Sequence, residues 1–299
     1  MRKVFLSGGS GFIGRNLIES LGGDYVILAP RHAELDLTDS DAVRVWFAEN
    51  RPEAVVHAAT KPGHRNAQNA TDIASANLRM FTALLEASRA CGVERFLFLG
   101  SGSEFDMRNY RPKMKEDSLG LFVPEDDTGF SKYMCTRMLA GFPGYVNVRF
   151  FGIFGKYEDY AIRFISNAIC KVLCDLPITL RQNRRFDYVC AEDGAAVIRR
   201  FLEIPAERLE YHDYNVTPDG STELLELARV VCRVAGKPEH PILVANEGLG
   251  AEYSGDNGRL RALFPDLAFT PLEQSVNALY TWYTDNQALI DIEKLLIDK

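Results

Sequence analysis

The sequence predicts an α/β protein whose core is a doubly wound parallel sheet, with a smaller α/β lobe formed by the C-terminal half. Three observations lead to this fold class. Short apolar runs alternate with helical patterns through the first half, a glycine-rich turn joins the first apolar run to the first helix, and the alternation weakens after residue 150. A chain of 299 residues with 46% hydrophobic composition can bury a large core.

Each apolar run of the first half is predicted to be a buried parallel strand, because strands covered on both faces lack polar alternation. These strands are expected at residues 4–6, 25–28, 54–58, 95–99 and 146–150. The helical patterns between them lie at 12–21, 40–50, 72–91 and 131–139. Strands and helices that alternate in this way form a sheet with helices on both faces.

The glycine-rich turn, residues 7–14 with the sequence SGGSGFIG, follows the first strand and opens the first helix. Glycine permits positive φ, a close approach of the backbone to a pyrophosphate, and tight packing of helix on strand. The helix N-terminus adds free N–H groups and a positive dipole end. The turn therefore predicts a dinucleotide site of the Rossmann type, although glycine also serves such turns for steric reasons alone. The expected contacts are Gly8, Gly11, Phe12, Ile13 and Gly14.

Residues after the second strand indicate which dinucleotide is bound. An acidic residue usually binds the ribose 2′-hydroxyl of NAD here, but this chain has Arg31. A guanidinium suits a 2′-phosphate, so NADP(H) is favoured and NAD(H) is possible; the alternative is an exposed loop arginine. Further contacts are expected from His32, Asp36 and Leu37. The same stretch also predicts the cap of the next helix, at Thr38 or Asp39.

The third strand ends in His57, Ala58 and Ala59. His57 is expected to be a packed strand residue rather than a catalytic base. The small side chains of Ala58 and Ala59 leave room for the backbone of the cofactor, so both are predicted to line its site.

The second half has fewer clear patterns. Helices are expected at about 160–174, 193–203, 221–235 and 271–286, with a strand at 178–180 and a turn at 181–186. We therefore predict a dinucleotide-binding domain over residues 1–155, rejoined by part of 186–218, and a mainly substrate-binding lobe over 156–299. Ligands of such sheets bind at the carboxyl ends of the strands, so the cleft is expected between the two parts.

Composition argues against several functional classes. A net charge of −7 and a pI near 5.4 disfavour a nucleic-acid partner. The six cysteines lack metal-ligand spacing, which predicts reduced thiols and no metal site. The first residues are too few and too polar for a signal peptide, and no run reaches the roughly 18 to 20 apolar residues of a membrane span. We therefore expect a cytoplasmic protein without a membrane partner.

Further segments at residues 77–87, 96–103, 149–155 and 214–216 complete an ordered set of motifs. This order resembles the extended short-chain dehydrogenase/reductase family of nucleotide-sugar epimerases, dehydratases and reductases, and within it the GDP-fucose synthase-like enzymes, over nearly the whole chain. The resemblance implies that Ser101 is the catalytic Ser/Thr, that Lys132 binds the nicotinamide ribose, and that Asn77 supports the fourth strand. It also implies a nucleoside diphosphate sugar as substrate and a homodimer through helices 72–91 and 131–139.

Departures from the family pattern narrow the function. Thr128 stands where the family's Tyr-x-x-x-Lys has its tyrosine, whose phenol exchanges a proton with the sugar oxygen. A threonine hydroxyl is a far weaker acid. The proton then comes through a water held by Thr128, or from Ser103, Glu104 or Tyr133. Gly102-Ser103 replaces the Asp-Glu pair of the family's dehydratases, which disfavours elimination of water.

The segment expected to bind the substrate also differs from the family pattern. Phe186 stands where the family has an arginine on the diphosphate, and the neighbouring Arg184 or Arg185 could supply that charge. Arg163 and Asp256 are further candidates for substrate contact.

These features predict an NAD(P)-dependent oxidoreductase acting on a nucleoside diphosphate sugar, with 4-keto reduction, with or without epimerisation, as the favoured activity. An NAD-dependent nucleotide-sugar epimerase is the alternative within the enzyme class. The alternative of another class is a catalytically attenuated cofactor- or nucleotide-sugar-binding protein, because Thr128 replaces the tyrosine.

Overall fold

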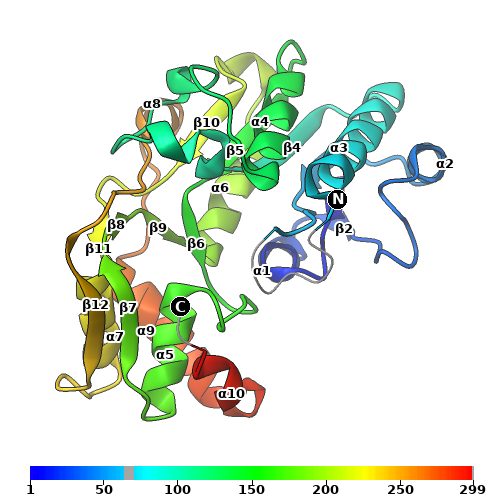
Figure 1. The fold of residues 1–299 in the computed structure, drawn as a ribbon. Coiled ribbons are helices and arrows are strands. Elements are labelled where there is room, and N and C mark those ends of the chain that lie inside the picture. The colour runs from blue at the N-terminus through cyan, green and yellow to red at the C-terminus, as the bar shows by residue number, and fades with distance from the viewer. Residues whose placement is uncertain (64–70, 298–299) are drawn as a thin grey trace.

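The computed structural model, which describes residues 1–63 and 71–297, confirms the predicted α/β class (Figure 1). Its main sheet contains β1 (Lys3–Ser7), β2 (Val26–Leu28), β3 (Ala54–His57), β4 (Arg95–Ser101), β5 (Tyr145–Phe150) and β10 (Asp213–Val216). The strand order is β10-β5-β4-β3-β1-β2, and every pairing is parallel. The order reverses between β1 and β3, so a crevice is expected at the carboxyl ends of these two strands.

Two layers of helices cover the sheet. One face carries α1 (Phe12–Leu21), α6 (Ala191–Glu203) and α8 (Gly258–Leu263); the other carries α2 (Ser40–Asn50), α3 (Ile73–Ala90) and α4 (Asp127–Leu139). Alternate residues of β1 face opposite layers: Val4 and Leu6 pack in the first core and Phe5 in the second. Because both faces are buried, the strands read as continuous apolar runs.

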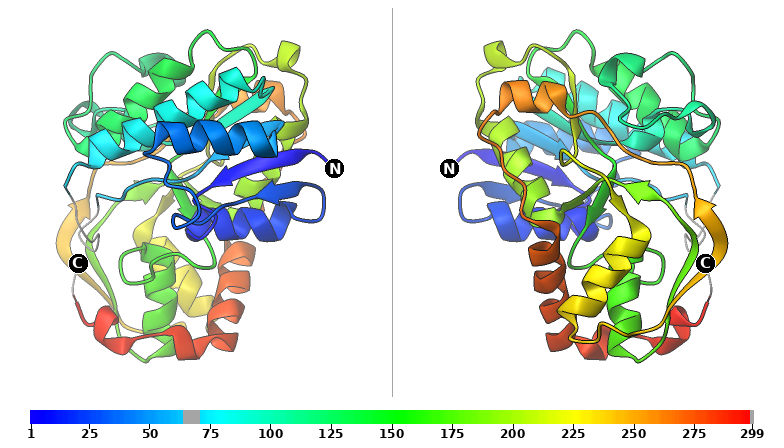
Figure 2. Two further views of the ribbon diagram at one scale, coloured as in Figure 1. Left: turned by 90° about the vertical axis from the view of Figure 1, so that its right-hand side faces the viewer. Right: turned by 90° about the vertical axis from the view of Figure 1, so that its left-hand side faces the viewer.

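The second half builds a separate hydrophobic core. Its helices are α5 (Phe164–Leu173), α7 (Leu224–Val234), α9 (Leu272–Asp285) and α10 (Ile292–Leu295). Three strand pairs accompany them: β7 (Ile178–Asn183) with β12 (Ile242–Leu249), β6 (Gly152–Phe154) with β9 (Tyr188–Cys190), and β8 (Arg185–Phe186) with β11 (Thr222–Glu223). Figure 2 shows this group of helices below the main sheet. Short 3-10 helices are η1 (Gly102–Glu104), η2 (Met107–Asn109), η3 (Glu116–Ser118), η4 (Ala206–Arg208) and η5 (Gln287–Leu289).

Several element boundaries differ from the expectations. Helix α4 begins at Asp127 instead of residue 131, because the Asp126 side chain caps it by accepting a hydrogen bond from Gly129 N at 2.8 Å. The stretch 181–186 is largely strand: β7 continues to Asn183, and Arg185 and Phe186 form β8. Strand β12 was not anticipated, because most of its residues are exposed and its apolar run, residues 242–245, is short and passes directly into polar residues.

A buried ion pair joins the central strands. The Arg149 guanidinium on β5 lies 2.8 Å from Glu104 Oε2 and 3.0 Å from Asp213 Oδ2 on β10, and the side chains of Arg149 and Glu104 are fully buried. Thr136 on α4 and Asn147 on β5 also donate to Glu104 Oε2, at 2.9 and 2.8 Å. These partners satisfy charges that would otherwise be costly to remove from water. Carboxylate neighbours accordingly raise the pKa of Arg149, against the effect of burial.

Strand β3 ends in a buried histidine. Ser7 Oγ lies 2.7 Å from His57 Nδ1 and accepts hydrogen bonds from Ala58 N and Ala59 N, both at 3.0 Å. With both backbone N–H groups directed at it, the Ser7 hydroxyl donates its own proton to Nδ1, so the neutral ring carries its proton on Nε2. Burial, with a smaller contribution from Lys132, lowers the pKa of His57 to about 3. His57 is therefore the packed residue that the sequence predicted.

Glu104→Gln is expected to lower the free energy of unfolding by about 3 kcal/mol, because it leaves the buried Arg149 without its main counter-ion. Denaturant titration measures the loss. The control is Glu273→Gln, which removes an exposed ion pair with Arg233 and should cost less than about 1 kcal/mol. Equal denaturation midpoints for both variants would contradict the expectation that the buried ion pair contributes more to stability than the exposed one.

His57→Gln is expected to flatten the acid side of the stability profile. Between pH 6.5 and about 3 the unfolded chain binds a proton at this residue and the folded chain does not, so stability falls as the pH falls. The wild-type minus variant difference in unfolding free energy should change by up to about 1.4 kcal/mol per pH unit in that window. The exposed His32, changed to Gln, serves as the control for the loss of an imidazole.

Candidate active site

The glycine turn brings the ends of β1 and β3 together. Gly8 has φ +73°, and a Cβ added to it would lie 2.8 Å from Ala59 N. A Cβ on Gly14 would collide with the carbonyl oxygen of Gly8, so helix α1 can pack this closely only on glycine. Gly11 is the N-cap of α1 and makes no side-chain cap bond, which leaves first-turn N–H groups for a ligand.

A first cavity of about 420 Å³ opens beside this turn. It contains five of the predicted cofactor residues: Gly8, His32, Asp36, Leu37 and Ala59. Its wall combines the glycine backbone with apolar side chains such as Leu35 and Met80. The Asp36 carboxylate accepts hydrogen bonds from the N–H and hydroxyl of Thr38, at 2.9 and 2.8 Å, which hold its pKa below the usual value. Asp36 thus shapes the loop that closes this cavity.

Arg31 lies at the margin of the first cavity and does not line it. Its side chain is 78% exposed and forms an ion pair with Glu34 at 3.2 Å. The cap of α2 is Asp39, which accepts from the N–H groups of Asp41 and Ala42.

A second cavity, of about 540 Å³, continues from the first through Thr60, which lines both. It contains the predicted residues Phe12, Ile13, Ala58, Ser101, Lys132 and Arg163. Elements from both halves of the chain therefore meet here: the start of α1, the ends of β3 and β4, helix α4, and the segment before α5. This is the crevice expected from the reversal of strand order.

Ser101 and Lys132 are fixed at the end of β4. Ser101 N donates to Glu104 Oε1 at 2.8 Å, and Ser101 Oγ accepts from Ser103 N at 3.2 Å, which closes a capping box over η1. Lys132 Nζ donates to Leu99 O at 2.7 Å. Burial lowers the pKa of Lys132, with an opposing effect of Glu104.

Asn77 holds the loop after β3 rather than the fourth strand. Within the described residues its Oδ1 accepts from Lys61 N at 2.7 Å, and its Nδ2 donates to Lys61 O at 3.2 Å and to Ser131 Oγ at 3.5 Å. Asn77 therefore links this loop to α4 and supports the cofactor side of the cleft indirectly.

The four residues that the sequence suggested as sources of the proton do not line the second cavity. A Cβ on Gly63 would meet Thr128 Oγ1 at 2.7 Å, so Thr128 packs against the loop after β3 and does not line the cavity. The Ser103 hydroxyl is buried and has no hydrogen-bond partner in the described part of the chain. Glu104 is engaged by Arg149, and Tyr133 lies near Gly120.

A third cavity, of about 660 Å³, extends the second on the side of the C-terminal half. The two share Ile162, Phe164, Phe186 and Leu224. Arg181 and Arg184 line the third cavity, and neither forms an ion pair within the described ranges 1–63 and 71–297. Two unneutralised guanidinium groups beside an apolar channel suit a phosphorylated ligand.

Two predicted substrate residues lie outside these three cavities. Arg185 forms an ion pair with Glu223 at 2.9 Å across the β8–β11 pair, because the strand directs successive side chains to opposite faces. Asp256 accepts a hydrogen bond from Gly258 N at 2.9 Å and closes a local turn.

Sequence reasoning missed Glu158 and Tyr253, which both line the second cavity. Burial raises the pKa of Glu158 to about 8; one of its oxygens accepts from Ser166, and Oε2 has no partner among the described residues. Neither residue lies in a recognisable motif. Their positions follow from loops after β6 and β12, which no local pattern predicts.

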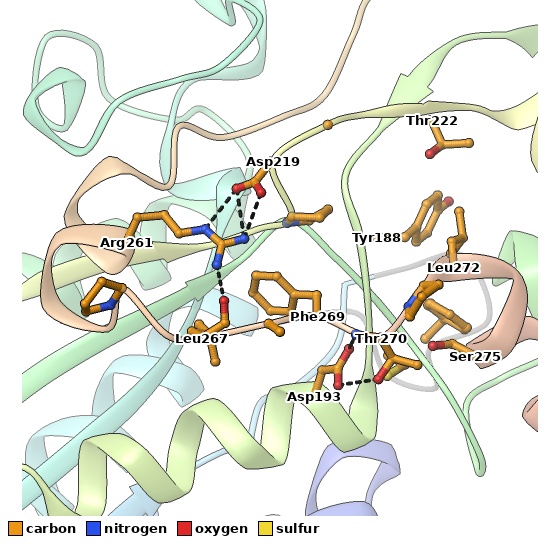
Figure 3. Close-up of a pocket in the computed structure, with 17 residues that line it drawn as sticks. Tyr188, Asp193, Asp219, Thr222, Arg261, Leu267, Phe269, Thr270, Leu272 and Ser275 are labelled. Atoms are coloured by element: carbon orange, nitrogen blue, oxygen red, sulfur yellow. Dashed lines mark hydrogen bonds and ion pairs between the residues drawn. The ribbon is translucent and has the colours of Figure 1, made fainter.

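Another cavity, of about 630 Å³, contains none of the predicted site residues (Figure 3). Asp219 accepts from Arg261 through both carboxylate oxygens at 2.9 Å, and Asp193 accepts from the backbone and hydroxyl of Thr270. Its charged side chains are thus already engaged with one another or with the backbone.

No helix within residues 1–63 and 71–297 is long and apolar enough to cross a membrane. In the same ranges, no three or more His, Cys, Asp or Glu side chains gather in a group that could hold a metal ion. The six cysteines form no disulfide.

Known proteins resemble this chain in sequence and in fold. A GDP-L-fucose synthase from Sinorhizobium fredii is 26% identical over 260 residues, which cover 79% of this chain and 80% of that protein. A probable GDP-L-fucose synthase 1 from Oryza sativa subsp. japonica is 41% identical over 105 residues, 33% of this chain and 32% of that protein.

Among solved structures, a GDP-mannoheptose C4 reductase from Campylobacter jejuni with NADP bound superposes with a TM-score of 0.80, at 20% identity, over 95% of this chain and 98% of that one. A UDP-glucose 4-epimerase from Thermotoga maritima gives 0.79 at 18% identity, over 95% and 99%. At these identities the structures establish a common fold. The model of the NAD dependent epimerase/dehydratase family matches residues 4–217, more than half of the chain, and the protein therefore belongs to that family.

Proposed function

We propose that the protein is an NAD(P)-dependent reductase of 4-keto nucleoside diphosphate sugars, acting with or without epimerisation. The observation that carries this proposal is the pair of neighbouring cavities that share Thr60, the second of which is lined by Ser101 and Lys132. The GDP-L-fucose synthase relatives and the fold shared with a GDP-sugar C4 reductase support the substrate class.

The residues of the cleft fit a nicotinamide dinucleotide. The exposed backbone at Gly8 and Gly11 and the uncapped start of α1 suit a pyrophosphate, and the first cavity suits the adenosine half. Lys132 would hold the nicotinamide ribose in the second cavity. The cofactor supplies a hydride to the sugar carbon or removes one from it.

The protein side chains position the sugar. Ser101 Oγ is a hydroxyl donor at the cavity wall, fixed through the backbone contact of Ser101 with Glu104, and would polarise the carbonyl oxygen of the substrate. Arg181 and Arg184 in the third cavity would bind the diphosphate by charge-assisted hydrogen bonds, in the role that the sequence suggested for Arg184 or Arg185. Apolar side chains shared by the two cavities would line the path between them.

Two partner assignments stay predictions. NADP(H) is favoured over NAD(H) through Arg31, whose exposed guanidinium is free to turn from Glu34 toward a 2′-phosphate. A homodimer through α3 and α4 is inferred from the family resemblance.

Incubation with NADPH and a panel of 4-keto GDP- and dTDP-sugars is expected to consume the nicotinamide absorbance. Ser101→Ala should lower kcat about 100-fold or more, because the carbonyl oxygen loses its donor. The exposed Ser40, changed to Ala, is the control and should retain wild-type turnover. Absence of turnover with every keto sugar at high enzyme concentration would contradict the function; tight retention of NAD and interconversion of 4-epimers would favour the epimerase instead.

Arg31→Ala is expected to weaken NADPH binding about 10-fold and NADH binding less than about 3-fold, because only NADPH carries the 2′-phosphate. Fluorescence titration of both cofactors measures the two dissociation constants. Arg44→Ala is a matched control, since Arg44 is 67% exposed and pairs with Asp41 on α2. Equal effects of Arg31→Ala on both cofactors would remove the basis for an NADP preference.

A further inference from the structure

The second cavity contains a phenol that lies beside Ser101. A Cβ added to Gly102 would lie 2.5 Å from the Tyr253 hydroxyl, so this hydroxyl sits directly against the residue that follows Ser101. Ser101 and Tyr253 both line the cavity together with Lys132. Tyr253 reaches this place from the segment after β12, far from Ser101 in sequence.

The Tyr253 backbone is held from two directions. Its N–H donates to Arg185 O at 2.9 Å and its carbonyl accepts from Asp187 N at 3.3 Å, which attaches the segment to β8 and to the start of β9. Phe186 forms a bridge with it in the same place. These contacts make the position of the phenol a property of the folded backbone rather than of a free loop.

The ring of Tyr253 is packed among three aromatic side chains. Its centroid lies 5.0 Å from Tyr110, 5.4 Å from Phe151 and 5.8 Å from Phe186. This packing leaves the hydroxyl as the polar end that faces Ser101, and restricts the rotamers that the side chain can adopt. A group that must meet a reacting atom benefits from such preorganisation.

We propose that Tyr253 is the proton donor of this active site and takes the role of the phenol that the family places four residues before its lysine. The assignment rests on the proposed reductase function. In reduction, a hydride from the reduced nicotinamide adds to the carbonyl carbon, and the electron pair of the C=O π bond moves to the oxygen. The O–H bond of Tyr253 breaks as that oxygen takes its proton, and the phenolate regains a proton from water. Ketone, reduced cofactor and one proton thus become alcohol and oxidised cofactor.

The charge state of the phenol agrees with this role. Burial raises the pKa of Tyr253 above that of a free tyrosine, and Glu104 adds to the rise, while Ser101 and Arg149 oppose it. The hydroxyl is therefore protonated at neutral pH, as a donor must be, although burial also makes it a weaker acid than a free tyrosine.

The position of the Tyr253 hydroxyl explains two departures from the family pattern. Gly102 stands where dehydratases have an acidic residue, and its missing side chain leaves the space that the Tyr253 hydroxyl fills. Thr128 stands where the phenol is expected, but it packs against Gly63 outside the cavity. A phenol that enters from the segment after β12 removes the need for one on α4.

The test is the Tyr253→Phe enzyme with NADPH and the best 4-keto sugar of the panel. We expect kcat to fall about 100-fold or more, with KM and the NADPH dissociation constant changed less than about 3-fold, because the ring packing is kept and only the acid is lost. Tyr110→Phe is the matched control: it removes a phenol from the same cluster, one that donates to Ser254 O at 2.9 Å. It should retain most of the turnover and the wild-type solvent isotope effect.

A second measurement separates proton donation from a purely structural role. The solvent isotope effect on kcat should differ from the wild-type value in Tyr253→Phe, whose side chain no longer donates the proton, and should be kept in Tyr110→Phe. Unchanged kcat in Tyr253→Phe, or equal losses and equal isotope effects in Tyr253→Phe and Tyr110→Phe, would overturn the assignment while the reductase function stands. A wild-type enzyme that reduces no keto sugar would overturn the proposed function, and the role of Tyr253 would fall with it.

Discussion

The buried contact between Arg149 and Glu104 is the interaction on which the active-site end of the sheet depends. Glu104 Oε2 connects η1 to β5 and α4, while Arg149 also reaches Asp213 on β10. The other oxygen of Glu104 accepts from Ser101 N. Two charges removed from water are costly unless other groups compensate them, and here Asp213, Asn147 Nδ2 and Thr136 do so. Asn147 Oδ1 is a buried acceptor without a hydrogen-bond partner among the described residues. The direction in which Ser101 presents its hydroxyl follows from this arrangement.

The cleft belongs to neither half of the chain alone. The glycine turn and the ends of β3 and β4 form one wall, while residues before α5, in β8 and β9, and after β12 form the other. The chain leaves the main sheet after β5 and enters the C-terminal half through β6. It returns through β9, which pairs with β6, and through α6, and then forms β10 at the edge of the main sheet. In the proposed reaction, the cofactor on one wall and the sugar on the other would meet at Ser101.

Particular residues mark the limit of prediction from sequence. Buried parallel strands were predictable because burial on both faces selects continuous apolar runs. The turn at Gly8 and Gly14 was predictable because the backbone there leaves no space for a Cβ, so only glycine fits. Strand β12 was not predicted, since its short apolar run at residues 242–245 is largely exposed and passes into polar residues. Arg185 and Asp256 carry suitable charges, yet Glu223 and a local turn engage them. The sequence does not show which residue a charged side chain pairs with, because the partner lies in a distant segment whose position depends on the fold.

The sequence by itself determined the α/β class, the glycine turn, and the places of Ser101 and Lys132 at a strand end and on the following helix. These features depend on local dihedral preferences and on short-range periodicity, which nearby residues specify. Only the tertiary structure decided that Tyr253 and Glu158 line the cavity at that strand end, and that Thr128 packs outside it. It also decided that Arg181 and Arg184 line the neighbouring third cavity. Such contacts join segments far apart in the chain, and they exist only after the two hydrophobic cores have fixed the segments in space.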